Sequence, residues 1–184
     1  MNKETLTKQL QELDENAQII LGIPKRKYSV IIIGGAAFLL NDLTSRGTTY
    51  DIDVFFADNA IRGILGTDPN LNFQCGVFSE NIPYNYEDRL QKLPIHTKVI
   101  DYYSPSPEDL AVLKLFRWQD RDIQDLTNPQ FLEKLDWELL DRLVNDPDEI
   151  RASRIPEAAK DRALSIFLEN YLQYRKGFIN ETRP

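Results

Sequence analysis

The sequence predicts an α+β (α/β) fold, with a short mixed sheet covered by helices and a helical extension at the C-terminal end. Strand-like runs rich in β-branched residues alternate with amphipathic stretches over residues 1–127, whereas residues 128–184 show helical periodicity only. A length of 184 residues suits one domain, so we expect the extension to pack on the same domain as the core.

The first third of the chain is expected to fold as helix, strand, helix and strand. Apolar residues recur at three- and four-residue steps from Leu6 to Ile20, which predicts a helix over residues 3–21. The run YSVIIIGG predicts a buried strand that closes on a glycine turn, AAFLLNDL a short helix, and TTYDIDVFF a second strand.

The middle of the chain, residues 58–94, is rich in loops. We expect a helix in ADNAIRGILG, a strand in FQCGVFS and an irregular segment over NIPYNYEDRLQKLP. The alternation in IHTKVIDYY then predicts a third strand. It carries His96, which we interpret as an ordinary strand residue; because it is the single histidine, multi-histidine zinc sites are excluded.

The last third is expected to be helical. SPSPEDLAVLKLFRWQDRDIQDL opens with the signals of a helix N-terminus, because prolines precede the first turn and Glu108 and Asp109 lie in it. Two further helices are predicted over about 129–145 and 156–176, the second ending before Gly177.

Composition restricts the class of protein. A net charge of −7 disfavours a broad nucleic-acid surface, since neutralising phosphates takes concentrated Lys and Arg, and residues 25–27 form one small basic cluster. Cys75 is the single cysteine, so no internal disulfide forms. The first residues are polar and no apolar run approaches a membrane span, so we expect a cytoplasmic protein without membrane contact.

Two aspartates one residue apart are the first sign of a site. Asp51 and Asp53 are expected to share one face of the second strand, about 7 Å apart. Carboxylates whose oxygens converge to about 4 Å repel by about 1 kcal/mol in water and about 4 kcal/mol at a dielectric near 20. Cations between them remove this repulsion, and oxygen ligands suit Mg²⁺ or Mn²⁺. The alternative is a solvated pair on an edge strand.

A glycine pair precedes the aspartates. Gly34 and Gly35 follow a buried strand and open a helix, where a backbone without Cβ atoms can approach a phosphate. The stretch matches neither the P-loop nor G-x-G-x-x-G, and such turns also use glycine for shape alone. Together with the acidic strand, which begins about 16 residues later, the glycine pair predicts a metal–triphosphate site.

The segment KLFRWQDRDIQDL supplies a third element. On one continuous helix its polar and aromatic side chains fall on one broad face: Lys114, Arg117 or Trp118, Arg121 or Asp122, and Asp125. A solvated charged face is the alternative. Against it, Lys114 lies within the apolar run LAVLKLF, and the charged residues after Trp118 are able to form a buried, paired cluster.

These motifs resemble the nucleotidyltransferase-fold proteins of the AbiEii abortive-infection toxin type, and their small relatives in particular. The signature runs Gly-Gly, Arg, Thr-x-Asp-Ile-Asp-Val and later Lys with Arg-Asp-x-x-Asp, and this chain matches it over about residues 30–126. The resemblance implies a minimal nucleotidyltransferase core of the DNA polymerase β-like superfamily.

The resemblance also implies roles for individual residues. Gly34 and Gly35 would grip the nucleotide phosphates. Asp51 and Asp53 would act in catalysis by holding magnesium (or manganese), and Lys114 would contact the triphosphate. The other motif residues expected to bind nucleotide are Arg46, Thr49, Arg121 and Asp125.

Two acidic residues have a less defined place in this pattern. Asp122 is expected either to assist catalysis or to orient Lys114 and Arg121. Polymerase-like cores often carry a third metal-binding carboxylate on a neighbouring strand, and Asp101 is the candidate for it here.

We therefore predict a metal-dependent nucleotidyltransferase that moves an NMP from an NTP to a hydroxyl of an RNA end, a protein or a small molecule. Related toxin systems make tRNA or a protein the candidate acceptor, and an antitoxin a candidate partner. The competing hypothesis is a nucleotidyltransferase fold that does not catalyse and serves as a binding or antitoxin-like module. Hydrolysis of sugars by the acidic pair is disfavoured, because it has no use for a phosphate cradle.

Overall fold

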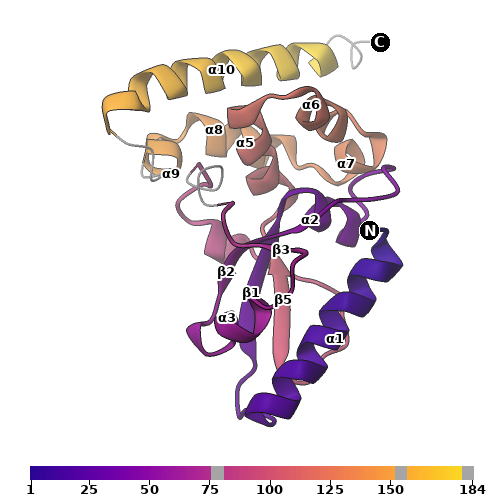
Figure 1. Cartoon of the computed structure of the whole chain (residues 1–184). Helices are drawn as coiled ribbons and strands as arrows, with labels where there is room; N and C mark the ends of the chain where they lie inside the picture. The colour runs from indigo at the N-terminus through magenta and orange to yellow at the C-terminus, as the bar shows by residue number, and fades with distance from the viewer. Residues whose placement is uncertain (76–80, 152–156, 180–184) are drawn as a thin grey trace.

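The structure, a computed structural model, describes residues 1–75, 81–151 and 157–179. Within these ranges the strands form one mixed sheet of order β3-β2-β1-β5-β4 (Figure 1). The strands are β1 (Tyr28–Ile33), β2 (Ile52–Ala57), β3 (Leu71–Asn72), β4 (Gln91–Lys92) and β5 (Ile100–Ser104). The α+β class with a short mixed sheet is therefore confirmed.

Strand β1 lies at the centre of the sheet, antiparallel to β2 and parallel to β5. Its last four residues, Val30 to Ile33, are apolar and almost fully buried, as expected of a strand with neighbours on both sides. The register places Ile33 opposite Asp53. Since Gly34 follows Ile33 directly, the glycine pair and the acidic strand meet at one end of the sheet.

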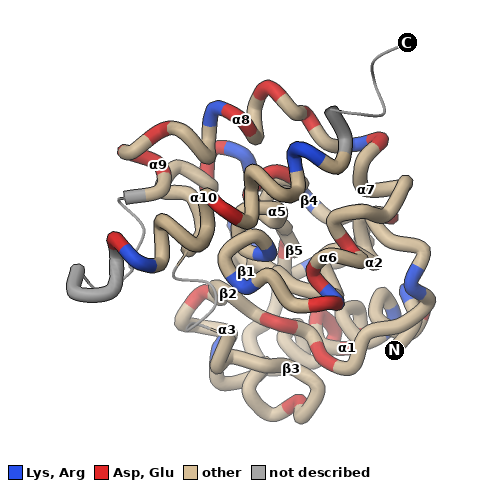
Figure 2. Tube along the Cα trace, turned by 90° about the horizontal axis from the view of Figure 1, so that it is seen from above, with Lys and Arg blue, Asp and Glu red and all other residues tan. Residues whose placement is uncertain are grey.

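The helices after β5 gather beyond this end of the sheet (Figure 1). They are α5 (Pro107–Arg117), α6 (Asp120–Leu126), α7 (Pro129–Lys134), α8 (Trp137–Asn145), α9 (Pro147–Arg151) and α10 (Glu157–Ile179). Helix α10 packs on α5, where the rings of Phe116 and Phe167 stack with centroids 4.1 Å apart. Figure 2, seen from above, shows acidic and basic positions interspersed along these helices.

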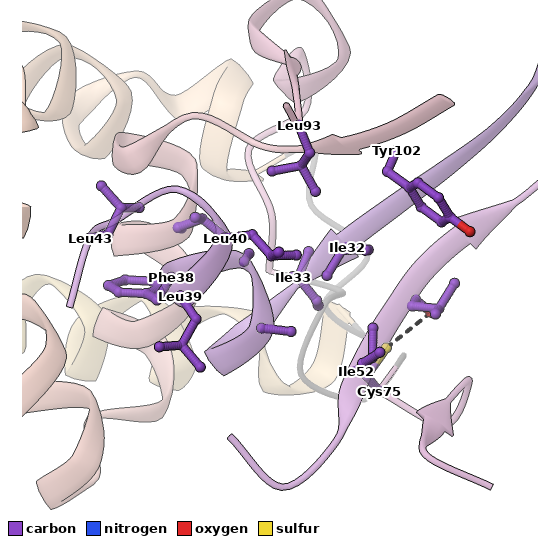
Figure 3. Close-up of a cluster of buried hydrophobic side chains, with 14 of the residues drawn as sticks. Ile32, Ile33, Phe38, Leu39, Leu40, Leu43, Ile52, Cys75, Leu93 and Tyr102 are labelled. Atoms are coloured by element: carbon purple, nitrogen blue, oxygen red, sulfur yellow. Dashed lines mark hydrogen bonds between the residues drawn. The ribbon is translucent and has the colours of Figure 1, made fainter. Parts of the chain in front are cut away.

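The hydrophobic core joins the sheet to three helices near it, α1 (Lys3–Leu21), α2 (Gly34–Leu40) and α3 (Asn59–Leu65), and continues into the helices α5 to α10. Helix α1 contacts both α2 and α3. Figure 3 shows how Phe38 and Leu40 of α2 lie in one cluster with Ile32 of β1. Burying each such side chain stabilises the fold by about 1.5–3 kcal/mol.

Helix α1 is fastened to the sheet by a buried carboxylate. Asp14 is 3% exposed and accepts the backbone N–H groups of Lys98, Val99 and Ile100, each at 2.7 Å. In addition, the hydroxyl of Tyr102 on β5 donates to the carbonyl of Leu10 at 2.8 Å. These bonds align the residues that lead into β5 with the helix.

Two helices expected to be continuous are interrupted. The helix predicted in SPSPEDLAVLKLFRWQDRDIQDL divides into α5 and α6 at Trp118, whose φ of 49° lies in the left-handed region. The predicted helix over 129–145 divides into α7 and α8 around Asp136, which caps α8 by accepting the N–H groups of Glu138 and Leu139. The last helix does not end before Gly177 but continues to Ile179.

The strand boundaries also differ from the predictions. Strand β2 begins at Ile52, so Asp51 precedes it, and β5 begins at Ile100, which leaves His96 exposed before the strand; its interpretation as a strand residue is wrong. The strand near FQCGVFS is Leu71–Asn72, and residues 76–80 of that run lie outside the described ranges. Helix α2 starts at the glycine pair itself.

The remaining predictions for the first half are confirmed. The helices α1 and α3 fall within the predicted runs, and the irregular segment over 81–94 holds one 3-10 turn, η1 (Tyr86–Arg89), and β4. Among the described helices, none combines the length and the apolar character that crossing a membrane requires.

Replacing Asp14 by alanine should lower the free energy of unfolding by about 3 kcal/mol, because three N–H groups, two of them in buried hydrogen bonds, lose a charged acceptor. Urea denaturation of the purified proteins measures this difference. Glu15→Ala is the matched control, since Glu15 is exposed on the same helix and should change stability by less than about 0.5 kcal/mol. Equal stabilities of the two variants would contradict this account.

Candidate functional site

A cavity of about 440 Å³ lies between the end of β1, the start of β2 and the helices α5 and α6. Most residues that the sequence singled out line it: Gly34, Gly35, Arg46, Thr49, Asp51, Asp53, Lys114, Arg121 and Asp125. Residues from Gly34 to Asp125, far apart in the sequence, thus share one cavity. Two predicted residues, Asp101 and Asp122, are not among its lining.

The glycine pair allows backbone and side chains to approach closely at this corner. Gly34 has a φ of 67°, and a Cβ atom on it would collide with Oδ2 of Asp53. A Cβ atom on Gly35 would lie 2.7 Å from both Nη2 of Arg46 and Oγ1 of Thr49. Any larger residue would therefore displace the side chain of Asp53, or those of Arg46 and Thr49.

Asp53 is the more enclosed of the two aspartates. It is half-buried, and its Oδ1 accepts a hydrogen bond of 2.8 Å from Nδ2 of Asn72 on the edge strand β3. Burial and the nearby charge of Asp51 raise the pKa of Asp53, although Asn72, Arg117 and Lys114 oppose the shift. Asp51 is exposed and lies before the strand, but both carboxylates line the same cavity.

The acidic pair fits a hard divalent cation whose coordination is completed by other ligands. Among the described residues, no group of three or more His, Cys, Asp or Glu side chains converges in a way that could hold a metal ion. Two carboxylates beside a cavity suit Mg²⁺, which commonly takes one or two protein carboxylates together with substrate phosphates and water. Burial, followed by the negative charge of Asp51, raises the pKa of Asp53, and a bound cation would stabilise the charged form.

Lys114, which also lines the cavity, is buried in a cluster of ion pairs. It is 5% exposed, and its Nζ donates to Oδ1 of Asp122 at 3.2 Å and to Oδ2 of Asp125 at 2.8 Å. Nζ also lies 4.5 Å from the ring centroid of Phe38. On a straight helix Lys114 and Asp122 would be about 12 Å apart, so the break at Trp118 creates this contact.

Asp122 does not line the cavity, and its carboxylate contacts the cationic groups of Lys114 and Arg117 instead. It is fully buried and accepts a bond of 2.7 Å from Nε of Arg117. Burial acts to raise the pKa of Asp122, but the hydrogen bonds from Arg117 and the charge of Lys114 outweigh it and lower the pKa. Of the two roles expected for Asp122, this placement favours orientation, with Arg117 in place of Arg121 as the partner.

Arg46 brings a further cationic group to the glycine corner. Its Nη2 lies 3.6 Å from Oδ2 of Asp125, and about one third of its side chain (34%) is exposed. The Nε atom is buried, and no residue in the described part of the chain accepts a hydrogen bond from it. A buried donor without an acceptor is costly, and because one third of the side chain is exposed, Arg46 is accessible to an anionic ligand in the cavity that it lines.

Asp101 is not brought to the acidic pair. It lies opposite Ser29 in the β1–β5 ladder, four residues along β1 from Ile33, where Asp53 pairs. Its carboxylate forms ion pairs with Lys92 at 2.8 Å and Lys27 at 3.3 Å. A third metal ligand at this position is therefore not compatible with the geometry.

Sequence reasoning missed several residues of the cavity. Asn72, which holds Asp53, sits on a two-residue strand without a sequence signal, and Tyr50 and Gln124 were not singled out. Cys75 also lines the cavity; burial, followed by the charge of Asp53, raises the pKa of its thiol to about 11. Because its pKa is raised, the thiol is a poor nucleophile at neutral pH. Its Sγ lies 3.3 Å from the carbonyl of Val54.

Comparison with known proteins agrees with this geometry. A protein-family model described as a nucleotidyltransferase of unknown function (DUF6036) matches residues 8–177. No curated protein and no solved structure matches the chain significantly. The match covers both the cavity and the helices α7 to α10, so it includes nearly all of the fold.

Replacing Asp53 by asparagine should stabilise the ligand-free protein at pH 7 by about 1 kcal/mol. The substitution removes a negative charge that burial and the nearby Asp51 make unfavourable, and it keeps an acceptor for Asn72. Since folding raises the pKa of Asp53, its charged form opposes folding as the pH rises through that pKa. The gain should therefore disappear in acid, below the ordinary aspartate pKa.

Thermal melts of the wild type and Asp53→Asn between pH 3 and pH 8 measure this difference. Asp88→Asn is the control, because Asp88 is exposed in η1 and does not line the cavity. A variant less stable than the wild type at pH 7 would show that the Asp53 charge contributes to folding.

Proposed function

We propose that this chain, which belongs to the DUF6036 family of nucleotidyltransferases, transfers an NMP from an NTP to an acceptor hydroxyl in a metal-dependent reaction. The observation that carries the proposal is that carboxylates and cationic side chains line one cavity beside the glycine pair. We call Asp51 and Asp53 the acidic wall, and the cationic residues of the loop after α2 and of α5 and α6 the basic wall: Arg46, Lys114, Arg117 and Arg121. An NTP bound to divalent cations needs both kinds of wall.

In the reaction, an acceptor hydroxyl attacks the α-phosphorus of the NTP. A new P–O bond forms, the bond to the oxygen that bridges the α- and β-phosphates breaks, pyrophosphate leaves, and the hydroxyl proton passes to solvent. Asp51 and Asp53 would hold Mg²⁺ or Mn²⁺, which when bound stabilises phosphate charge and lowers the pKa of the attacking hydroxyl.

The basic wall positions the triphosphate. Arg46, with its unpaired Nε, lies beside Gly35, and Lys114 lies deeper between its two carboxylates. Asp122 and Asp125 keep these cations in fixed positions, so that little reorganisation is needed when charge develops on the leaving group. Catalysis would then depend mainly on orientation and on preorganised charge.

The motif resemblance supports a relation to toxin–antitoxin nucleotidyltransferases of the AbiEii type. It makes an RNA end, a protein side chain or a small molecule the class of acceptor, and an antitoxin a possible binding partner. A non-catalytic binding module remains the competing function, and turnover separates the two.

In the presence of Mg²⁺ and each α-labelled NTP, the protein should label an acceptor in tRNA or in cell lysate. Asp51→Asn and Asp53→Asn should each reduce labelling by at least about 100-fold, because each removes charge from the acidic wall. EDTA should abolish labelling by the wild type. The control is Asp88→Asn, which should label as well as the wild type.

Labelling that persists in both folded aspartate variants would refute the proposed site. Binding of NTP without transfer to any acceptor, under all conditions tested, would favour the non-catalytic module.

A further inference from the structure

An exposed tyrosine stands at the rim of the cavity. Tyr50 directly precedes Asp51, lines the cavity and is 81% exposed. Large aromatic rings usually gain free energy by being covered, and an open ring beside a ligand site commonly serves as a contact surface. The metal-binding role proposed for the aspartates does not account for the exposure of this ring.

The backbone on both sides of Tyr50 is held in place. The N–H of Thr49 donates to the carbonyl of Met1 at 2.8 Å, and Oγ1 of Thr49 lies 3.3 Å from the carbonyl of Asp51. On the other side β2 begins at Ile52. The ring is thus presented from a fixed segment rather than from a free loop.

Arg121 accompanies the ring from helix α6. Its guanidinium carbon lies 5.4 Å from the ring centroid of Tyr50, within cation–π range. In the described ranges of the chain, no carboxylate forms an ion pair with Arg121, whereas Lys114, Arg117 and Arg46 are all paired. Arg121 therefore supports the ring and leaves its charge available to a ligand.

We propose that Tyr50, with Arg121 beside it, is the surface on which the nucleobase of the NTP stacks. This inference rests on the proposed nucleotidyl transfer. The glycine corner and Lys114 take the triphosphate, so the base must leave the cavity towards another part of its lining. Among the described residues of that lining, two are aromatic; Phe38 is fully buried, whereas Tyr50 is accessible.

Stacking on a tyrosine ring requires no hydrogen bond to a particular base edge. All four NTPs are therefore bound, and the purine nucleotides bind more tightly because their rings overlap more of the tyrosine. The ring acts on binding and leaves the triphosphate contacts unchanged. This separation of base from phosphate makes the proposal testable.

Calorimetric titration with ATP and with inorganic tripolyphosphate, both with Mg²⁺, compares wild type, Tyr50→Ala and Tyr50→Phe. Tyr50→Ala should weaken ATP binding by about 5- to 150-fold and leave tripolyphosphate binding unchanged. Tyr50→Phe should retain ATP affinity. The matched control is Tyr84→Ala, which removes another exposed tyrosine that does not line the cavity.

Unchanged ATP affinity in Tyr50→Ala overturns the proposal. This holds also if the variant loses apparent affinity for an RNA acceptor, because the ring would then stack on a base of the acceptor and not on that of the NTP. A parallel loss of ATP and tripolyphosphate binding also overturns it, because the ring would then support the phosphate site. If the wild type binds neither ATP nor tripolyphosphate, the proposed function and this inference are both overturned. If the wild type binds ATP and Tyr50→Ala binds it equally well, the inference alone is overturned.

Discussion

The burial of Lys114 is the constraint on which the site depends. An ammonium group in the interior is tolerated only when carboxylates pair with it, and removing one partner of such a cluster typically costs about 3–5 kcal/mol. Asp122 and Asp125 supply these partners from α6, so the chain must reverse direction after α5. The left-handed conformation of Trp118 accomplishes this reversal, and the same reversal brings Arg121 to the cavity.

The two walls of the cavity differ in how their charge is compensated. The cations of the basic wall are largely neutralised by Asp122 and Asp125, whose partners are within the protein. Asp53 has a neutral partner, Asn72, and burial together with the nearby charge of Asp51 raises its pKa. The fold thus accepts unfavourable electrostatics at the acidic wall, which is expected where a ligand, rather than the protein, completes the charge balance.

The sequence was informative where function depends on residues close together in the chain. The glycine pair, the Asp51–Asp53 spacing and the apolar setting of Lys114 all describe local patterns, and the structure brings these residues to one cavity. The reversal at Trp118 was not predictable, because a positive φ at a tryptophan has no composition signal. The sequence suggested Asp101 as a third metal ligand, but the position of this residue depends on the ladder register. In that register it pairs with Ser29, at the other end of β1.

The overall charge of the chain bears on the kind of acceptor that can reach this cavity. A net charge of −7 repels an extended polyanion over distances of about one Debye length, roughly 8–10 Å. At the cavity, however, four cations (Arg46, Lys114, Arg117, Arg121) balance four carboxylates, three of its lining and Asp122 bound to Arg117, so the site itself carries no net negative charge that would repel a triphosphate. This contrast favours an acceptor that presents only its reacting hydroxyl to the cavity, such as a protein side chain, a small molecule or the terminal nucleotide of an RNA, over one that must lie along the protein surface.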